Sequence, residues 1–139
     1  MVGDTNQELL ARVPLFSELS KSELERISQV AVPRSFPAGS RVFHEGDPGD
    51  SCYIVKGGHA RAIREHPDGR SITLATFGPG DFFGEGAIFR ARRRTATVTT
   101  TEPTVLFAMF GADFAKLVGD IPLLHAQIEE ALDARLPVD

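Results

Sequence analysis

The chain of 139 residues has the length of one ordinary domain, which we place over residues 1–139, and it is long enough to bury a hydrophobic core unaided. Its formal net charge of −4 argues against a basic nucleic-acid-binding domain, and its single cysteine, Cys52, excludes an internal disulfide framework. The sequence holds no apolar run long enough to span a membrane and no N-terminal apolar signal region. We therefore expect a cytoplasmic location without membrane insertion.

Helical patterns occupy both ends of the chain. Asn6 can cap a short first helix, and a second helix is predicted after Ser20, which forms a capping-box pattern with Glu23. Apolar residues of this second helix recur at helical spacing at Leu24, Ile27 and Val30. From Gly111 the pattern becomes helical again. A last helix is predicted from Pro122, with one broad apolar side formed by Leu123, Leu124, Ile128, Leu132 and Leu136.

Between these helices, short runs of β-type residues alternate with turn signals, a pattern typical of an all-β sandwich or barrel. The predicted strands are residues 31–36, 41–45, 52–56, 59–65, 71–77, 95–101 and 104–110. Asp68-Gly69 lies between two alternating runs and is a strong hairpin signal. The sequence therefore predicts a mainly β fold with flanking helices.

One segment interrupts this strand pattern and has the chemistry of a binding site. Gly84 allows a tight turn, and residues 85–89 can form one helical turn whose N–H groups favour an anion. Arg94 opens the next strand, and its planar fork suits two phosphate oxygens. A carboxylate such as Glu85 beside an anion makes sense when the ligand also carries a hydroxyl donor. Taken singly, each of these features is more typical of a turn or a solvated surface, but together they indicate a nucleotide.

The motif Phe83-Gly84-Glu85-Gly86-Ala87, followed by Arg94-Thr95-Ala96, closely resembles the phosphate-binding cassette of the cyclic-nucleotide-binding domain family. This family includes bacterial catabolite activators, protein kinase regulatory domains and cyclic-nucleotide-gated channels. Tyr53 to Gly57, Gly46-Asp47 and Gly80-Asp81 also resemble it. The resemblance implies a double-stranded β-helix (jelly roll) with N-terminal helices, a short cassette helix and C-terminal helices.

The resemblance also implies a role for each residue of the motif. Glu85 would accept a hydrogen bond from the ribose 2′-OH, and Arg94 would pair with the cyclic phosphate. Thr95 would offer its hydroxyl to the phosphate or the base. Backbone N–H groups would complete the anion site near Gly86, Ala87 and Ala96.

A base pocket is implied less directly. Leu74 and Phe77 would form its apolar walls, and Leu132 or Leu136 of the last helix would cap it. Arg61 stands where the family often has a small apolar residue near the base, although an exposed strand arginine explains it equally well.

The ligand is expected to be cAMP or cGMP, bound by a regulatory sensor that relays binding through its C-terminal helix. A threonine after the cassette arginine, as at Thr95, occurs in binders of either nucleotide, and we favour cAMP as the commoner bacterial ligand. Gly86 departs from the bulky apolar residue of the family, which removes a base contact and loosens the helical turn. Since no nucleophile–base set is visible, we expect neither an enzyme nor a catalytic cofactor.

Alternatives remain open at this stage. A degenerate roll or an interaction module without ligand is one; the sensor fragment of a transcription factor, channel or enzyme is another. A cupin-type metalloenzyme is least favoured, because no two of His44, His59, His66 and His125 have the spacing of metal ligands on one strand face. We expect no direct DNA binding by this chain. Homodimerisation through the last helix, or pairing with an effector domain, stays open.

Overall fold

The computed structural model describes residues 2–89 and 93–134. Its helices are α1 (Val2–Ala11), the 3-10 turn η1 (Pro14–Phe16), α2 (Lys21–Val30), α3 (Gly86–Phe89), α4 (Gly111–Asp120) and α5 (Pro122–Ala134). Its strands are β1 (Val32–Phe36), β2 (Arg41–Phe43), β3 (Ser51–Gly57), β4 (Ala60–Glu65), β5 (Ser71–Phe77), β6 (Phe82–Phe83), β7 (Thr97–Thr100) and β8 (Thr104–Phe110). None of the described helices is long and apolar enough to cross a membrane.

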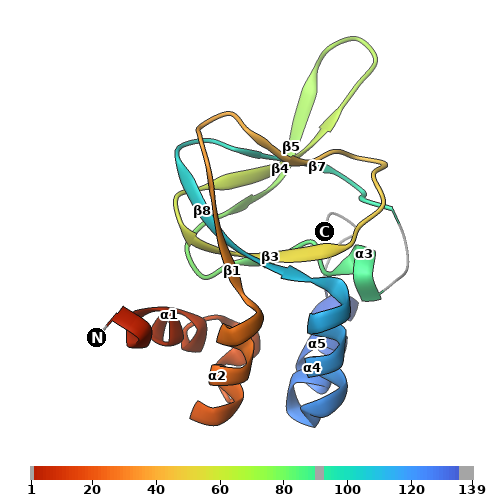
Figure 1. Ribbon diagram of the computed structural model, residues 1–139. Helices are drawn as coiled ribbons and strands as arrows, with labels where there is room; N and C mark the ends of the chain where they lie inside the picture. Colours follow the sequence, from red (N-terminus) through yellow and green to blue (C-terminus); the bar gives the residue numbers. More distant parts are fainter. Residues whose placement is uncertain (1, 90–92, 135–139) are drawn as a thin grey trace.

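The strands form two four-stranded antiparallel sheets, with the orders β1-β8-β3-β6 and β2-β7-β4-β5. Helices α1, α2, α4 and α5 gather on one side of the β structure, and α3 lies at one end of it (Figure 1). The mainly β architecture with flanking helices, and with a short helix in the predicted cassette, is therefore confirmed.

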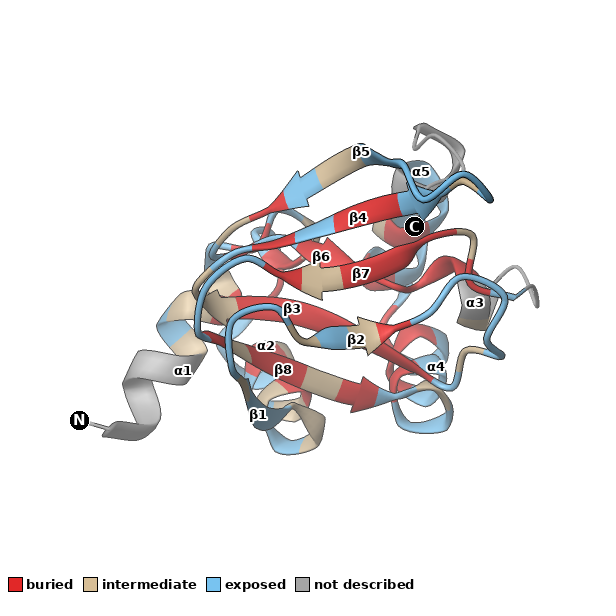
Figure 2. Cartoon of the chain, turned by 90° about the horizontal axis from the view of Figure 1, so that it is seen from above, coloured by how far each residue is buried: buried red, intermediate tan, exposed pale blue. Residues whose placement is uncertain are grey.

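The first sheet is the middle layer of the molecule, as alternation along β3 shows. Cys52 and Ile54 belong to a buried cluster shared with the helices, whereas Tyr53 and Val55 belong to a second cluster between the two sheets. Successive strand residues point to opposite faces, so β3 is buried on both sides. Figure 2 shows that β3 and the strands beside it are largely buried.

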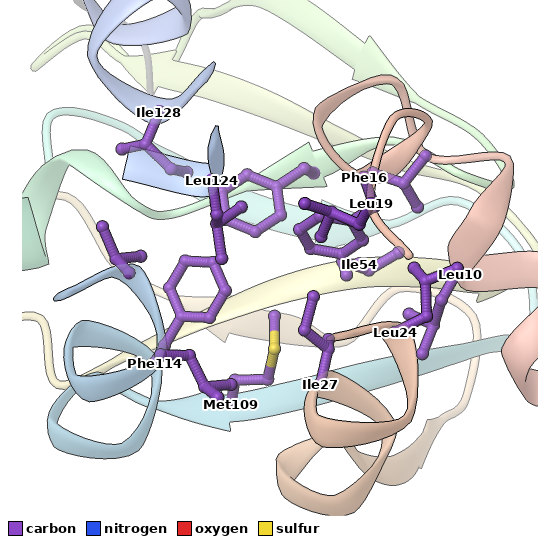
Figure 3. Packing of buried hydrophobic residues seen from close by; sticks show 14 of the residues in the cluster. Leu10, Phe16, Leu19, Leu24, Ile27, Ile54, Met109, Phe114, Leu124 and Ile128 are labelled. Atoms are coloured by element: carbon purple, nitrogen blue, oxygen red, sulfur yellow. The ribbon is translucent and has the colours of Figure 1, made fainter. Parts of the chain in front are cut away.

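The helical layer closes over the outer face of this sheet. Leu24 and Ile27 of α2, Phe114 of α4 and Ile128 of α5 converge on the same cluster (Figure 3). The predicted capping box begins α2: the Ser20 hydroxyl accepts from the Glu23 N–H at 3.2 Å, and the Glu23 carboxylate accepts from the Ser20 N–H at 2.8 Å.

The predicted strands are confirmed with differences at their ends. β2 ends at Phe43 and not at residue 45, because the His44 N–H donates to the Asp47 carboxylate and starts a turn. β7 begins at Thr97, two residues later than predicted. β6 was not predicted at all; its two phenylalanines diverge, Phe82 toward the helices and Phe83 toward the second sheet.

Candidate functional site

The segment between β6 and β7 opens with a turn that only glycine accommodates well. Gly84 has φ +87°, a backbone conformation that residues with a Cβ rarely adopt. A Cβ at this position would also lie 2.9 Å from the Arg94 Nη1 atom. Glu85 follows, and then α3 begins at Gly86. Both the backbone angle and the closeness of Arg94 therefore require glycine at position 84.

The Arg94 side chain lies inside the protein and joins three segments. It is 4% exposed. Its Nη1 donates to the Gly84 carbonyl at 2.8 Å, and its Nη2 donates to the Ser51 carbonyl at 2.7 Å. Its Cζ lies 3.9 Å from the ring centroid of Phe43. The guanidinium thus connects the cassette turn with the start of β3 and the end of β2.

The Arg94 backbone is held as firmly as its side chain. Its N–H donates to the Asp47 carbonyl at 2.8 Å, and its own carbonyl accepts from the Gly46 N–H at 2.8 Å. The neighbouring Arg93 donates from Nη1 to the Gly46 carbonyl at 3.0 Å. The loop of residues 44–50 therefore pairs with the chain where it leaves the cassette.

Glu85 brings a second buried charge to this place. It is only 1% exposed, although carboxylates are rarely buried unless they are paired. Burial, and then the negative charge of Glu85, raise the pKa of the Cys52 thiol well above its ordinary range, while Arg94 acts in the opposite direction. The charges of Glu85 and Arg94 therefore both act on the Cys52 thiol. Glu85 directly follows Gly84, whose carbonyl accepts from Arg94, so these two charged residues lie near one another in the interior.

The two residues after Arg94 lie at the edge of the same region. Thr95 is half-buried, and its carbonyl accepts from Arg64 Nη2 at 3.0 Å. Ala96 is completely buried in the cluster between the sheets. At the other end of the segment, Gly86 and Ala87 form the first residues of α3.

The residues predicted for a base pocket separate into two groups. Phe77 is buried and stacks on Phe83 with ring centroids 4.7 Å apart, and Leu74 packs against the same cluster. Arg61 is exposed, since its neighbours Ala60 and Ala62 occupy the inner face of β4. The structure thus places Arg61 on the outer face of the second sheet, away from the other candidates, as expected of an ordinary strand arginine.

The predicted cap falls on the C-terminal end of the chain. Leu132 belongs to α5, but its side chain is outside what the structure describes, and Leu136 lies outside the described residues. Arg90 and Arg92, between Ala87 and Arg94 in the sequence, also lie outside them. Among residues 2–89 and 93–134, no three His, Cys, Asp or Glu side chains gather as metal ligands would.

Sequence reasoning missed two contributors to the site, Phe43 and Ser51. Both contact Arg94 from distant parts of the chain, Ser51 across 43 residues. The Ser51 contribution is a backbone carbonyl, which leaves no signal in the residue type. An aromatic residue just before the turn at Gly46-Asp47 is the only sequence signal that points to Phe43.

Comparison with known proteins identifies the class to which this fold and site belong. Residues 33–120 match the family model described as "Cyclic nucleotide-binding domain". The chain is a member of the cyclic nucleotide-binding domain family, whose members include receptors, gene regulators and kinase regulatory subunits.

Individual relatives agree with this assignment. The chain is 34% identical to the cyclic AMP receptor protein of Thermus thermophilus over 88% of its own length and 57% of the relative. It is 35% identical to the CRP-like cAMP-activated global transcriptional regulator of Mycobacterium tuberculosis, over 93% of this chain and 58% of the relative.

The fold agrees with that of a solved relative. The crystal structure of Thermus thermophilus catabolite activator protein superimposes with a TM-score of 0.80 and 33% identity, over 86% of this chain and 56% of that chain. This match confirms the jelly roll with flanking helices. The chain thus spans somewhat more than half the length of these relatives.

Proposed function

We propose that this chain is a regulatory sensor that binds cAMP at the cassette. The observation that carries the proposal is the buried pair of opposite charges, with Glu85 1% and Arg94 4% exposed beside a glycine turn. In the proposed complex, Arg94 donates to the cyclic phosphate and Glu85 accepts from the ribose 2′-OH. A guanidinium carries five N–H donors in a planar fork, so one side chain can hold backbone carbonyls and also bind an anion.

The remaining roles in this proposal are those that the family resemblance implies. Backbone N–H groups of Gly86, Ala87 and Ala96 complete the phosphate site, and the Thr95 hydroxyl contacts phosphate or base. Phe77 and Leu74 provide the apolar wall for the base, since both pack on the cluster between the sheets. Preference for cAMP over cGMP is supported by two relatives, the cyclic AMP receptor protein of Thermus thermophilus and the cAMP-activated global transcriptional regulator of Mycobacterium tuberculosis.

Binding would be relayed through the C-terminal helices to an effector. Helix α4 begins directly after β8, and its first residue, Gly111, donates to the Asp50 carbonyl at 2.7 Å. Helix α5 follows and buries Leu124 and Ile128 in the helical cluster. A ligand that favours one arrangement of these helices would shift a two-state equilibrium. Capping of the base by Leu132 or Leu136 is part of this proposal.

Calorimetric titration with cAMP and cGMP side by side tests binding and preference together. We expect Arg94→Ala to weaken cAMP binding by about 10- to 150-fold, because it removes charge-assisted hydrogen bonds. Arg61→Ala is the matched control, since Arg61 is an exposed arginine on the outer face. Arg94→Lys keeps the positive charge but removes the planar fork. Thermal unfolding of each variant, measured in parallel, shows whether weaker binding reflects loss of folding.

The ribose role has its own test. Glu85→Ala should weaken cAMP binding more than the binding of 2′-deoxy-cAMP, because the deoxy analogue lacks the hydroxyl that would donate a hydrogen bond to Glu85. Equal losses for the two nucleotides would contradict the role given to Glu85. Absence of binding by the parent chain would favour a roll that has the fold and no ligand.

A further inference from the structure

An aromatic ring lies directly beneath the guanidinium of the site. The Cζ of Arg94 is 3.9 Å from the centroid of the Phe43 ring, a distance at which a cation lies in contact with an aromatic face. Both side chains are buried, Phe43 with 7% and Arg94 with 4% of its surface exposed. Attraction between a cation and an aromatic ring is strongest when water is excluded from it.

The local fold fixes this contact from two sides. Phe43 is the last residue of β2, paired with Val98 of β7, and faces the interior. The chain then turns, and Gly46 and Asp47 pair with the Arg94 backbone through two hydrogen bonds of 2.8 Å. One turn therefore holds the Arg94 backbone and places a ring against its side chain.

The ring is itself held by other aromatic side chains. Phe43 lies 6.1 Å from Tyr53 and 6.2 Å from Phe83, measured between ring centroids. Phe83 in turn stacks on Tyr53 at 5.4 Å and on Phe77 at 4.7 Å. A row of contacting rings therefore runs from Arg94 to Phe77, the proposed wall of the base pocket.

We propose that Phe43 is a positioning residue for phosphate recognition. Its ring supports one face of the Arg94 guanidinium, while the Gly84 and Ser51 carbonyls fix the orientation of the group within its plane. A guanidinium held in this way keeps one orientation, so it loses little rotamer freedom when it binds the cyclic phosphate. This inference rests on the proposed function, because it concerns the same site and ligand.

The test is a double-mutant cycle on cAMP affinity. Phe43→Leu keeps an apolar side chain and removes the aromatic face, so we expect cAMP binding about 10- to 30-fold weaker. Phe43→Tyr should restore most of the affinity. In an Arg94→Gln background the same Phe43→Leu change should have little effect, since a residue that acts through Arg94 has nothing left to position.

A core substitution elsewhere provides the matched control. Phe36→Leu alters a ring of β1 that packs against the same cluster, and the cation over the Phe36 ring is Arg34, with its Cζ 5.7 Å from the ring centroid. Its cAMP affinity should equal that of the parent chain. The ring current of Phe43 should also shift the Arg94 side-chain proton signals upfield in the ligand-free protein, and this shift should disappear in Phe43→Leu.

The outcomes separate this inference from the proposed function. Equal effects of Phe43→Leu in the parent and Arg94→Gln backgrounds would overturn the positioning role, as would equal losses for Phe36→Leu and Phe43→Leu. An unchanged Arg94 signal in Phe43→Leu would also overturn it. If the parent chain shows the upfield shift but does not bind cAMP, the contact exists and the proposed function fails, and with it the role in phosphate recognition.

Discussion

Replacing Gly84 with alanine changes the site at the point where backbone and ligand-binding side chain meet. The residue has φ +87°, and an added Cβ would lie 2.9 Å from Arg94 Nη1. The neighbouring atom is a donor already bonded to the Gly84 carbonyl at 2.8 Å. The substitution should therefore strain the backbone and displace the guanidinium together.

The expected loss can be worked out from these two effects. A residue with a Cβ in the left-handed region costs about 1–2 kcal/mol. Loss of a hydrogen bond to a charged group costs about 1.5–3 kcal/mol. Gly84→Ala should therefore lower the free energy of unfolding by about 2.5–5 kcal/mol. The second effect alone, applied to ligand binding, corresponds to about 10- to 150-fold weaker cAMP affinity.

Gly69→Ala separates the two effects. Gly69 lies in the turn between β4 and β5 with φ +89°, and a Cβ there would have no atom within 4 Å. Gly69→Ala should lower the free energy of unfolding only through backbone strain, and its cAMP affinity should equal that of the parent chain. Urea unfolding followed by circular dichroism, with calorimetric titration of cAMP, measures both quantities. Equal destabilisation and equal affinity in the two variants would refute the role given to the Gly84–Arg94 contact.

Three further predictions concern folding and titration. Because Cys52 is buried and its pKa is raised, its thiol should react with a disulfide reagent only as fast as the protein unfolds. The free energy of unfolding should also fall as the pH rises above 9.0, the ordinary pKa of this thiol, because the unfolded chain then loses the thiol proton while the folded protein keeps it. Ser20→Ala should lower the free energy of unfolding by about 0.5–2 kcal/mol in urea titration, since the N–H of Glu23 loses its acceptor. The hydrogen bond from Arg26 lowers the pKa of Asp120, so the stability gained from this pair should be present above pH 3.8 and be lost below it. The difference in unfolding free energy between the parent and Asp120→Asn should shrink accordingly in acid.

Features set by neighbouring residues were predictable from the sequence. Asp68-Gly69 predicted a hairpin, and the Gly69 N–H donates to the His66 carbonyl between β4 and β5. Ser20 with Glu23 predicted the start of α2. Such signals depend on chemistry within about four residues, so a short stretch of sequence is enough to predict them.

Features that depend on distant segments were not predictable in the same way. The two-residue strand β6 is too short for alternation to reveal, and it forms only because β3 offers a partner. The contact of Phe43 with Arg94 requires the return of the chain after β2, which no local pattern describes. For Arg61 the sequence left an exposed strand arginine and a residue near the base equally open, and the structure shows it exposed between the inward-facing Ala60 and Ala62.

The aromatic row beside Arg94 has an optical consequence. The chain contains one tyrosine and no tryptophan, so its intrinsic fluorescence comes mainly from the phenol of Tyr53. That phenol accepts a hydrogen bond from the Ser51 hydroxyl at 2.9 Å, and the carbonyl of the same serine accepts from Arg94. Emission from the unlabelled protein should therefore report events at the guanidinium, which would allow the kinetics of ligand arrival to be followed without a dye.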